Sequence, residues 1–126
     1  MSATVAVVPS LTAVDYFRAK LAYELNAHGL KPLMEKNAVV LLDVRDAASF
    51  ALEHIPGALN IPLADLSKNL MNLPKDRMIV TYCWNISCFS APKAALELAQ
   101  KGFMVQALCG GIADWKNAGF PVELGK

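Results

Sequence analysis

The segment 79–95 constrains the fold of this chain most strongly, because it reads as a strand, a short loop and a helix in succession. Residues 78–82 form a short apolar run rich in strand-forming side chains. Five apolar residues then recur at helical spacing and predict one apolar stripe on a helix: Ala91, Ala94, Ala95, Leu98 and Ala99. We expect Ser90 to cap the first turn of this helix and Gly102 to end it.

The loop between the predicted strand and helix begins at Cys83. A cysteine at the carboxyl end of a parallel strand, facing a helix amino terminus, lies among backbone N–H donors and the positive end of a helix dipole. Such surroundings bind anions and lower the pKa of a thiol, and the thiolate is the nucleophilic form. Cys83 is therefore our candidate for covalent chemistry. The alternative is that Cys83 is a small buried apolar residue, as most free cysteines are.

Length and composition predict one ordinary soluble domain. The chain has 126 residues, of which 55% are hydrophobic, and this is enough for a well-buried sheet. Its twelve basic and eleven acidic residues are interleaved, which argues against nucleic acid as a partner. Three cysteines without a framework spacing argue against a disulfide scaffold and for a reducing compartment. We recognise no signal peptide or membrane-spanning run, so we expect a cytoplasmic protein that does not contact membranes.

The first third of the chain predicts helices followed by a buried strand. Residues 1–37 read as a helical extension packed on the domain, with one helix opened by Ser10 and a short second helix over 30–36. Residues 38–44 are apolar on both faces, as expected of a central parallel strand covered by helices. The domain proper is therefore expected over residues 38–126.

The remaining segments predict an α/β fold in which helices flank a central parallel sheet. Short helices are expected over 47–52 and 63–70, and between them the segment 54–62 reads as a turn that leads into a brief strand. A further strand over 103–108 leads through a glycine turn into a last helix that carries Trp115. Strands that alternate with helices imply right-handed crossovers and parallel pairing.

The sequence resembles the rhodanese-like domain family. The matching motifs occur in order over residues 38–122, about two-thirds of the chain. They are the segments 41–45, 54–58, 60–62, 82–83, 94–95, 110–111 and 119–121, together with Trp115. The resemblance implies a three-layer fold with a central parallel sheet, and it places the chain among single-domain members with an atypical, longer active-site loop.

The resemblance also implies a sulfurtransferase or persulfide carrier. In active members, the cysteine that Cys83 matches takes sulfane sulfur from thiosulfate or a persulfide and passes it to a thiol or cyanide. Six loop residues would bind the persulfide and the anionic donor through their amides: Trp84, Asn85, Ile86, Ser87, Cys88 and Phe89. The implied partners are a small sulfur-containing donor and a thiol acceptor, which could be a protein. No cofactor or metal is implied, and a homodimer is left open.

The loop departs from the common family pattern. Ile86 stands where a glycine is usual, and Cys88 stands where a basic residue is frequent. The segment between Cys83 and the Ala94-Ala95 pair is also about two residues longer than in the common form. No positive side chain lies between Cys83 and Phe89, so any attraction for thiosulfate rests on backbone dipoles. This favours a thiol-bound or protein-bound persulfide as the donor.

Cys88 could act as a resolving cysteine. Four residues separate it from Cys83, so it could attack a persulfide or sulfenic acid on Cys83 and form a disulfide. The alternative is a small residue packed at the start of the helix. A zinc site formed by the two cysteines is disfavoured, because no second close pair of ligands is present.

Other polar and aromatic residues are expected to serve the structure. Asp43 and Arg45 come at the end of a central strand, and we expect them mainly to tie that end to neighbouring turns. His54 opens a Pro-Gly turn and is expected to bond to the backbone rather than act as a base. Cys109 is expected to be buried. Trp84 could either line the mouth of the pocket or simply pack.

Two other functions compete with sulfur transfer. Related domains with a longer loop remove phosphate by means of an arginine at the position of Phe89, and its absence here argues against a phosphatase. The second alternative is a non-catalytic interaction module, or a redox-sensing module that uses Cys83 and Cys88. The missing basic residue supports this alternative, whereas the retained Cys83 opposes it.

Overall fold

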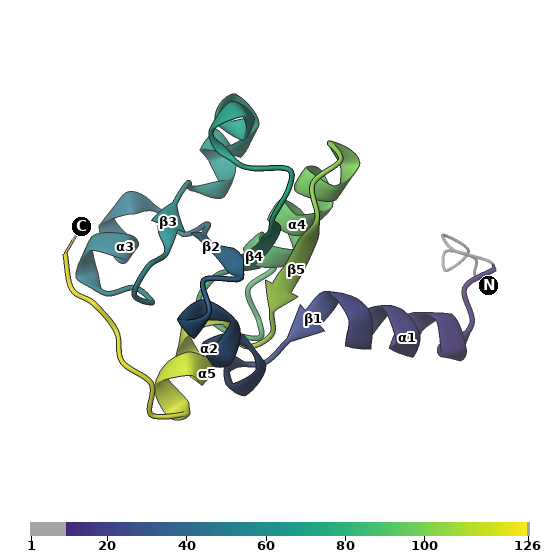
Figure 1. Cartoon of the computed structure of the whole chain (residues 1–126), viewed down its shortest axis with the longest axis horizontal. Helices are drawn as coiled ribbons and strands as arrows, with labels where there is room; N and C mark the ends of the chain where they lie inside the picture. The colour runs from purple at the N-terminus through teal and green to yellow at the C-terminus, as the bar shows by residue number, and fades with distance from the viewer. Residues whose placement is uncertain (1–9, 126) are drawn as a thin grey trace.

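The structure is a computed structural model of the chain, and it describes residues 10–125. Five parallel strands form one sheet in the order β1–β5–β4–β2–β3 (Figure 1). The strands are β1 (Glu24–Leu25), β2 (Val39–Asp43), β3 (Leu59–Asn60), β4 (Met78–Tyr82) and β5 (Val105–Leu108). The predicted α/β fold with a central parallel sheet is confirmed.

Helices cover both faces of this sheet. One face carries α2 (Ala27–Glu35) and α5 (Gly111–Asn117), which share a core cluster with Leu41 and Val80. The other face carries α4 (Ser90–Gln100) and the 3-10 helix η2 (Leu63–Lys68), and its core includes Leu42 and Ile79. The remaining elements are α1 (Ala13–Tyr23), α3 (Ala47–Leu52) and the 3-10 helix η3 (Leu70–Asn72).

The alternation of side chains along a strand explains why the central strands are apolar throughout. Leu41 and Leu42 are neighbours in β2, yet they belong to the two different core clusters. In β4 the same division separates Ile79 from Val80. Because each face of the sheet is covered by helices, neither set of side chains reaches water.

The helix predicted over 63–70 is present as the 3-10 helices η2 and η3, and in η2 only Leu66 is buried, so no apolar stripe holds a longer helix against the sheet. The predicted cap of α4 is wrong. Ser90 does not cap α4 but is its first residue, after Phe89 at the cap. The hydroxyl of Thr81 instead donates to the Ala91 carbonyl at 2.9 Å, which fastens the first turn of α4 to β4.

The amino-terminal region also differs from the prediction. Helix α1 begins after Thr12, whose side chain forms a capping box with Asp15, rather than after Ser10. None of the residues of α1 is buried, and the helix extends away from the sheet edge (Figure 1). Strand β1, which the sequence did not predict, pairs with β5, and α2 buries Leu30 in the core. The predicted extension thus contains one projecting helix, one strand of the sheet and one helix packed on the sheet. The division of the chain after residue 37 stays a prediction, and residues 1–9 lie outside the described part.

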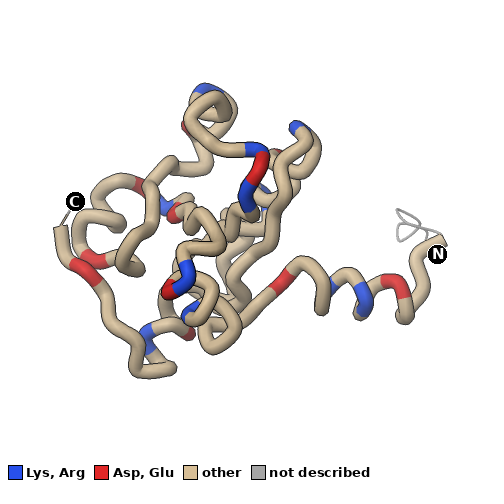
Figure 2. Tube along the Cα trace, viewed as in Figure 1, with Lys and Arg blue, Asp and Glu red and all other residues tan. Residues whose placement is uncertain are grey.

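Charged residues of both signs are interspersed along the chain (Figure 2). Among the described residues, three ion pairs join exposed or half-exposed side chains: Lys20 with Glu24, Lys31 with Glu35, and Lys116 with Glu53. Within residues 10–125, no helix combines the length and the apolar character that crossing a membrane requires.

Two leucines of α4 test the assignment of its buried face. Leu98 is fully buried in the core, so we expect Leu98→Ala to lower the free energy of unfolding by about 2–5 kcal/mol. Leu96 lies on the exposed side of the same helix, and Leu96→Ala should change it by no more than about 0.5 kcal/mol. Urea unfolding of both variants measures the difference, and equal losses would contradict the packing of α4 described above.

Candidate functional site

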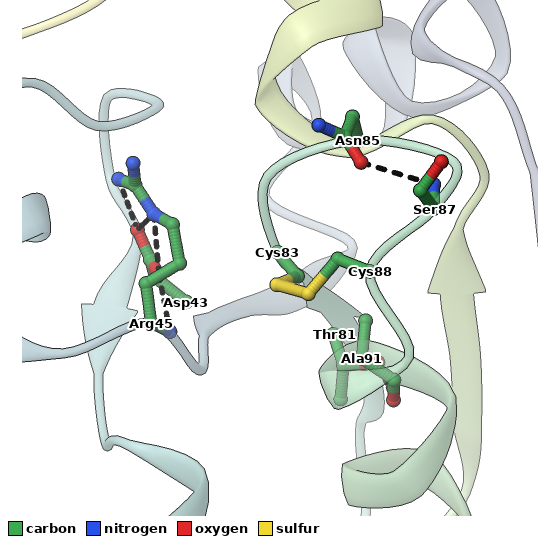
Figure 3. Close-up of a disulfide and its surroundings, with 8 residues drawn as sticks. All are labelled: Asp43, Arg45, Thr81, Cys83, Asn85, Ser87, Cys88 and Ala91. Atoms are coloured by element: carbon green, nitrogen blue, oxygen red, sulfur yellow. Dashed lines mark hydrogen bonds and ion pairs between the residues drawn. A yellow bond between two sulfur atoms is a disulfide. The ribbon is translucent and has the colours of Figure 1, made fainter.

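The site is the loop that joins β4 to α4. It begins at Cys83, directly after β4, rises over Asn85 and Ser87, and returns to Cys88 (Figure 3). A disulfide joins Cys83 to Cys88, with their Cα atoms 6.4 Å apart. The sequence predicts an accessible sulfur at Cys83, but in this disulfide-bonded form Cys83 is only 3% exposed.

The amino terminus of α5 holds the start of this loop in place. The N–H groups of Ile112 and Ala113 donate to the carbonyls of Cys83 and Trp84, each at 3.0 Å. A Cβ atom on Gly111 would lie 2.5 Å from the Cys83 carbonyl oxygen, and Gly111 has a φ of +60°. Both the close approach and the left-handed backbone therefore require glycine at this position.

The loop leaves several of its own N–H groups unused. The Ser87 N–H donates to Asn85 Oδ1 at 2.9 Å, and the Cys88 N–H donates to the Asn85 carbonyl at 3.1 Å. Within residues 10–125, the N–H groups of Trp84, Asn85 and Ile86 donate no hydrogen bond to protein atoms. Backbone N–H groups without an internal acceptor can bind an anionic sulfur species.

A buried ion pair supports the loop from the neighbouring strand end. Arg45 Nη2 donates to Asp43 Oδ2 at 2.8 Å (Figure 3). It also donates to the Glu53 carbonyl at 2.6 Å, so the pair ties β2 to the turn after α3. Burial opposes the charge on Arg45, but the hydrogen bonds and negative charge of Asp43 outweigh burial and raise the pKa of the guanidinium. The guanidinium also lies over the Trp84 ring, 4.5 Å from its centroid. Arg45 therefore contacts both the turn and the loop.

A cavity of about 250 Å³ lies beside the disulfide. Both loop cysteines line it, and so do Lys20 at the end of α1 and Glu24 in β1, which form an ion pair at 2.7 Å. The loop itself carries no basic side chain, and Lys20 of α1 places a positive charge beside it. The carboxylate of Glu24 neutralises this charge. The sequence analysis missed this pair, because only the parallel pairing of β1 with β5 brings it to the loop.

The third cysteine lines the same cavity. Cys109 follows β5 and is half-buried, rather than buried as predicted. Burial and the nearby Glu24 carboxylate raise the pKa of its thiol. Cys109 is therefore less ionised near neutral pH than an ordinary thiol.

The remaining predicted residues lie away from the cavity. His54 is buried, with Nδ1 2.8 Å from the Phe50 carbonyl oxygen, and its ring stacks on Phe50. Trp115 is a core residue whose Nε1 donates to the Pro121 carbonyl at 2.7 Å. A larger cavity of about 560 Å³ lies beside β2 and includes Val39 and Gly57, but neither loop cysteine lines it.

Known proteins are similar to this chain in sequence and in fold. The family model of the rhodanese-like domain matches residues 26–118. A thiosulfate sulfurtransferase GlpE of Coxiella burnetii is 34% identical over 67% of this chain and 78% of its own length. An HTH-type transcriptional regulator of Mycobacterium tuberculosis is 42% identical over 72% of this chain, which spans only 40% of that regulator. A crystal structure of a protein from Bacillus halodurans superposes with a TM-score of 0.82 at 36% identity, over 89% of this chain and 84% of the other.

The contact between α5 and the loop can be tested at two glycines. Gly111 and Gly119 both have a positive φ, but a Cβ on Gly119 would meet nothing within 4 Å. Gly119→Ala should therefore cost only the strain of a left-handed alanine, about 1–2 kcal/mol. Gly111→Ala should lower the free energy of unfolding by more than this, because its Cβ meets backbone atoms that cannot rotate away. Urea unfolding of both variants measures the two losses. Equal costs would contradict this account of the loop.

The pH dependence of Cys109 can be measured in a protein that retains no other thiol. The sequence has three cysteines, so the double variant Cys83→Ser/Cys88→Ser leaves only Cys109. Because the pKa of Cys109 is raised in the folded protein, the thiolate should form at higher pH than in the same protein unfolded in urea. Iodoacetamide labelling across pH measures the midpoint of thiolate formation in both states. A midpoint in the folded protein at or below that of the unfolded protein would refute the prediction.

Proposed function

Since the chain belongs to the rhodanese-like domain family, we propose that it is a sulfurtransferase or persulfide carrier with Cys83 as the nucleophile. The observation that carries this proposal is the position of Cys83, at the carboxyl end of β4 and at a cavity beside a loop with unused N–H groups. Similarity to a thiosulfate sulfurtransferase supports the same chemistry.

The proposed reaction has two steps once the disulfide has been reduced. The Cys83 thiolate attacks the outer sulfur of the donor, and the donor leaves as sulfite from thiosulfate or as a thiol from a persulfide. Cys83 now carries a persulfide, which the loop N–H groups bind. The thiolate of an acceptor then attacks the terminal sulfur and takes it, and this step returns the Cys83 thiolate.

The charges around the cavity favour a persulfide over thiosulfate as the donor. Thiosulfate is a dianion, and a site that prefers it needs net positive charge. The segment 83–89 carries no basic side chain, and Lys20 at the cavity is paired with Glu24. A thiol-bound persulfide carries less negative charge on its reacting end than thiosulfate does. Its binding therefore suffers less from the absence of net positive charge at the cavity.

A redox-sensing module is a second candidate function. The disulfide between Cys83 and Cys88 favours it, because an oxidant could switch the loop between two covalent states. Similarity to a segment of a transcriptional regulator is compatible with such a role. A sensor would form the disulfide with peroxide but would not take up sulfane sulfur. We do not propose a phosphatase, because Phe89 offers no guanidinium to phosphoryl oxygens.

Sulfur uptake tests the proposed function directly. The reduced protein is incubated with glutathione persulfide or, separately, with thiosulfate, and its intact mass is measured. We expect Cys83→Ser to gain no sulfur, whereas Cys88→Ser gains one sulfur atom, because only Cys83 is the nucleophile. Uptake should be faster from the persulfide. An equal gain of sulfur by Cys83→Ser would reject Cys83 as the nucleophile, and no gain by Cys88→Ser from either donor would favour the sensor.

A further inference from the structure

We propose that Cys88 discharges the Cys83 persulfide as hydrosulfide, so that the protein is left with the Cys83–Cys88 disulfide and a dithiol reductant restores it. This inference rests on the proposed function and names its product and the class of its partner. It starts from the observation that the candidate nucleophile is bonded to a second cysteine of the same loop.

The loop accommodates this disulfide with its own hydrogen bonds in place. The Cys83 carbonyl still accepts from Ile112, and the Cys88 N–H still donates to the Asn85 carbonyl. Asn85 Oδ1 also accepts from Ser87 (Figure 3). These hydrogen bonds therefore stabilise the loop conformation in which the disulfide is found.

The surroundings of Cys83 favour an internal thiol over an external one. Cys83 is almost fully buried, and the cavity beside it holds only about 250 Å³. An external acceptor must enter this cavity, whereas Cys88 is already within bonding reach of Cys83. Well-oriented groups in one molecule react as if present at about 10⁵ M or more, far above any free thiol. Cys88 should therefore react first.

The chemistry of this discharge balances without an external oxidant. The Cys88 thiol gives up its proton, and its sulfur attacks Sγ of Cys83. A new bond forms between the two cysteine sulfurs, and the bond from Cys83 Sγ to the outer sulfur breaks. The outer sulfur leaves with that electron pair, carries one proton and is released as hydrosulfide. Sulfane sulfur is reduced by two electrons, and two cysteine sulfurs are oxidised to one disulfide.

The reverse of this oxidation requires two electrons, and a dithiol supplies both because its second thiol resolves the mixed disulfide that its first thiol forms. Cys88 is more exposed than Cys83, so a dithiol reaches the sulfur of Cys88 first and frees the Cys83 thiolate. Three apolar side chains of the same loop are exposed: Trp84, Ile86 and Phe89, which are 43%, 69% and 67% exposed. No charged residue occurs in segment 83–90. Exposed apolar side chains of this kind suit a protein dithiol with an apolar contact surface.

The test follows the transferred sulfur atom after one equivalent of donor has been added. The reduced protein receives one equivalent of glutathione persulfide without added reductant, and hydrosulfide and intact mass are measured together. We expect the wild-type protein to release about one hydrosulfide per chain and to lose two hydrogen atoms in mass. Cys88→Ser and Cys88→Ala should both retain the added sulfur and release hydrosulfide at least ten-fold more slowly. Addition of dithiothreitol should return the wild-type protein to the reduced mass and permit a second release.

The outcomes separate this inference from the function on which it rests. Retention of the sulfur by the wild-type protein, with no hydrosulfide, would overturn the discharge by Cys88 and leave Cys83 as a persulfide carrier. Equal release from the two Cys88 variants would overturn it as well. Movement of the sulfur onto Cys88, seen by peptide mapping, would replace discharge by transfer within the loop. Failure of Cys88→Ser to gain sulfur would remove both the proposed function and this inference.

Discussion

The backbone contact between α5 and the loop after β4 is the constraint on which the candidate site depends. Gly111 lets the amino terminus of α5 approach the Cys83 carbonyl so closely that no side chain fits between them. The hydrogen bonds from Ile112 and Ala113 then fix the first two carbonyls of the loop. Because these carbonyls point into α5, the chain that follows Cys83 must turn over the end of the sheet, where ligands of open α/β sheets bind.

The position of the loop is therefore set by main-chain contacts, whereas its chemistry is set by sulfur. Arg45, which stacks on Trp84, already bonds to Asp43 and to the Glu53 carbonyl, and Lys20 is paired with Glu24. Neither cation is left as a free charge for an anionic donor. Two cysteines, the N–H groups of Trp84, Asn85 and Ile86, and the exposed apolar side chains of the loop remain for the reaction. Such a site suits exchange between sulfur atoms better than capture of a dianion.

Much of this arrangement could be predicted from the sequence. Strands β2 and β4 are apolar on both faces, and this pattern alone predicts a covered parallel sheet. The spacing of Cys83 and Cys88 suggested their disulfide. Strand β1 could not be predicted, since Glu24–Leu25 is too short to show a period and depends on pairing with β5. Its contribution to the cavity, through Glu24 and the adjoining Lys20, was missed for the same reason.

The central claim is that the fold turns Cys83 into a reactive nucleophile, and one rate measurement tests it most directly. In a Cys88→Ser/Cys109→Ser protein, Cys83 is the one cysteine of the sequence that remains. Its alkylation by iodoacetamide at neutral pH is compared between the folded protein and the same protein in urea. The account predicts faster alkylation in the folded protein, because the loop N–H groups stabilise the thiolate. Slower alkylation in the folded protein would show that Cys83 is an inert buried residue and would contradict the account.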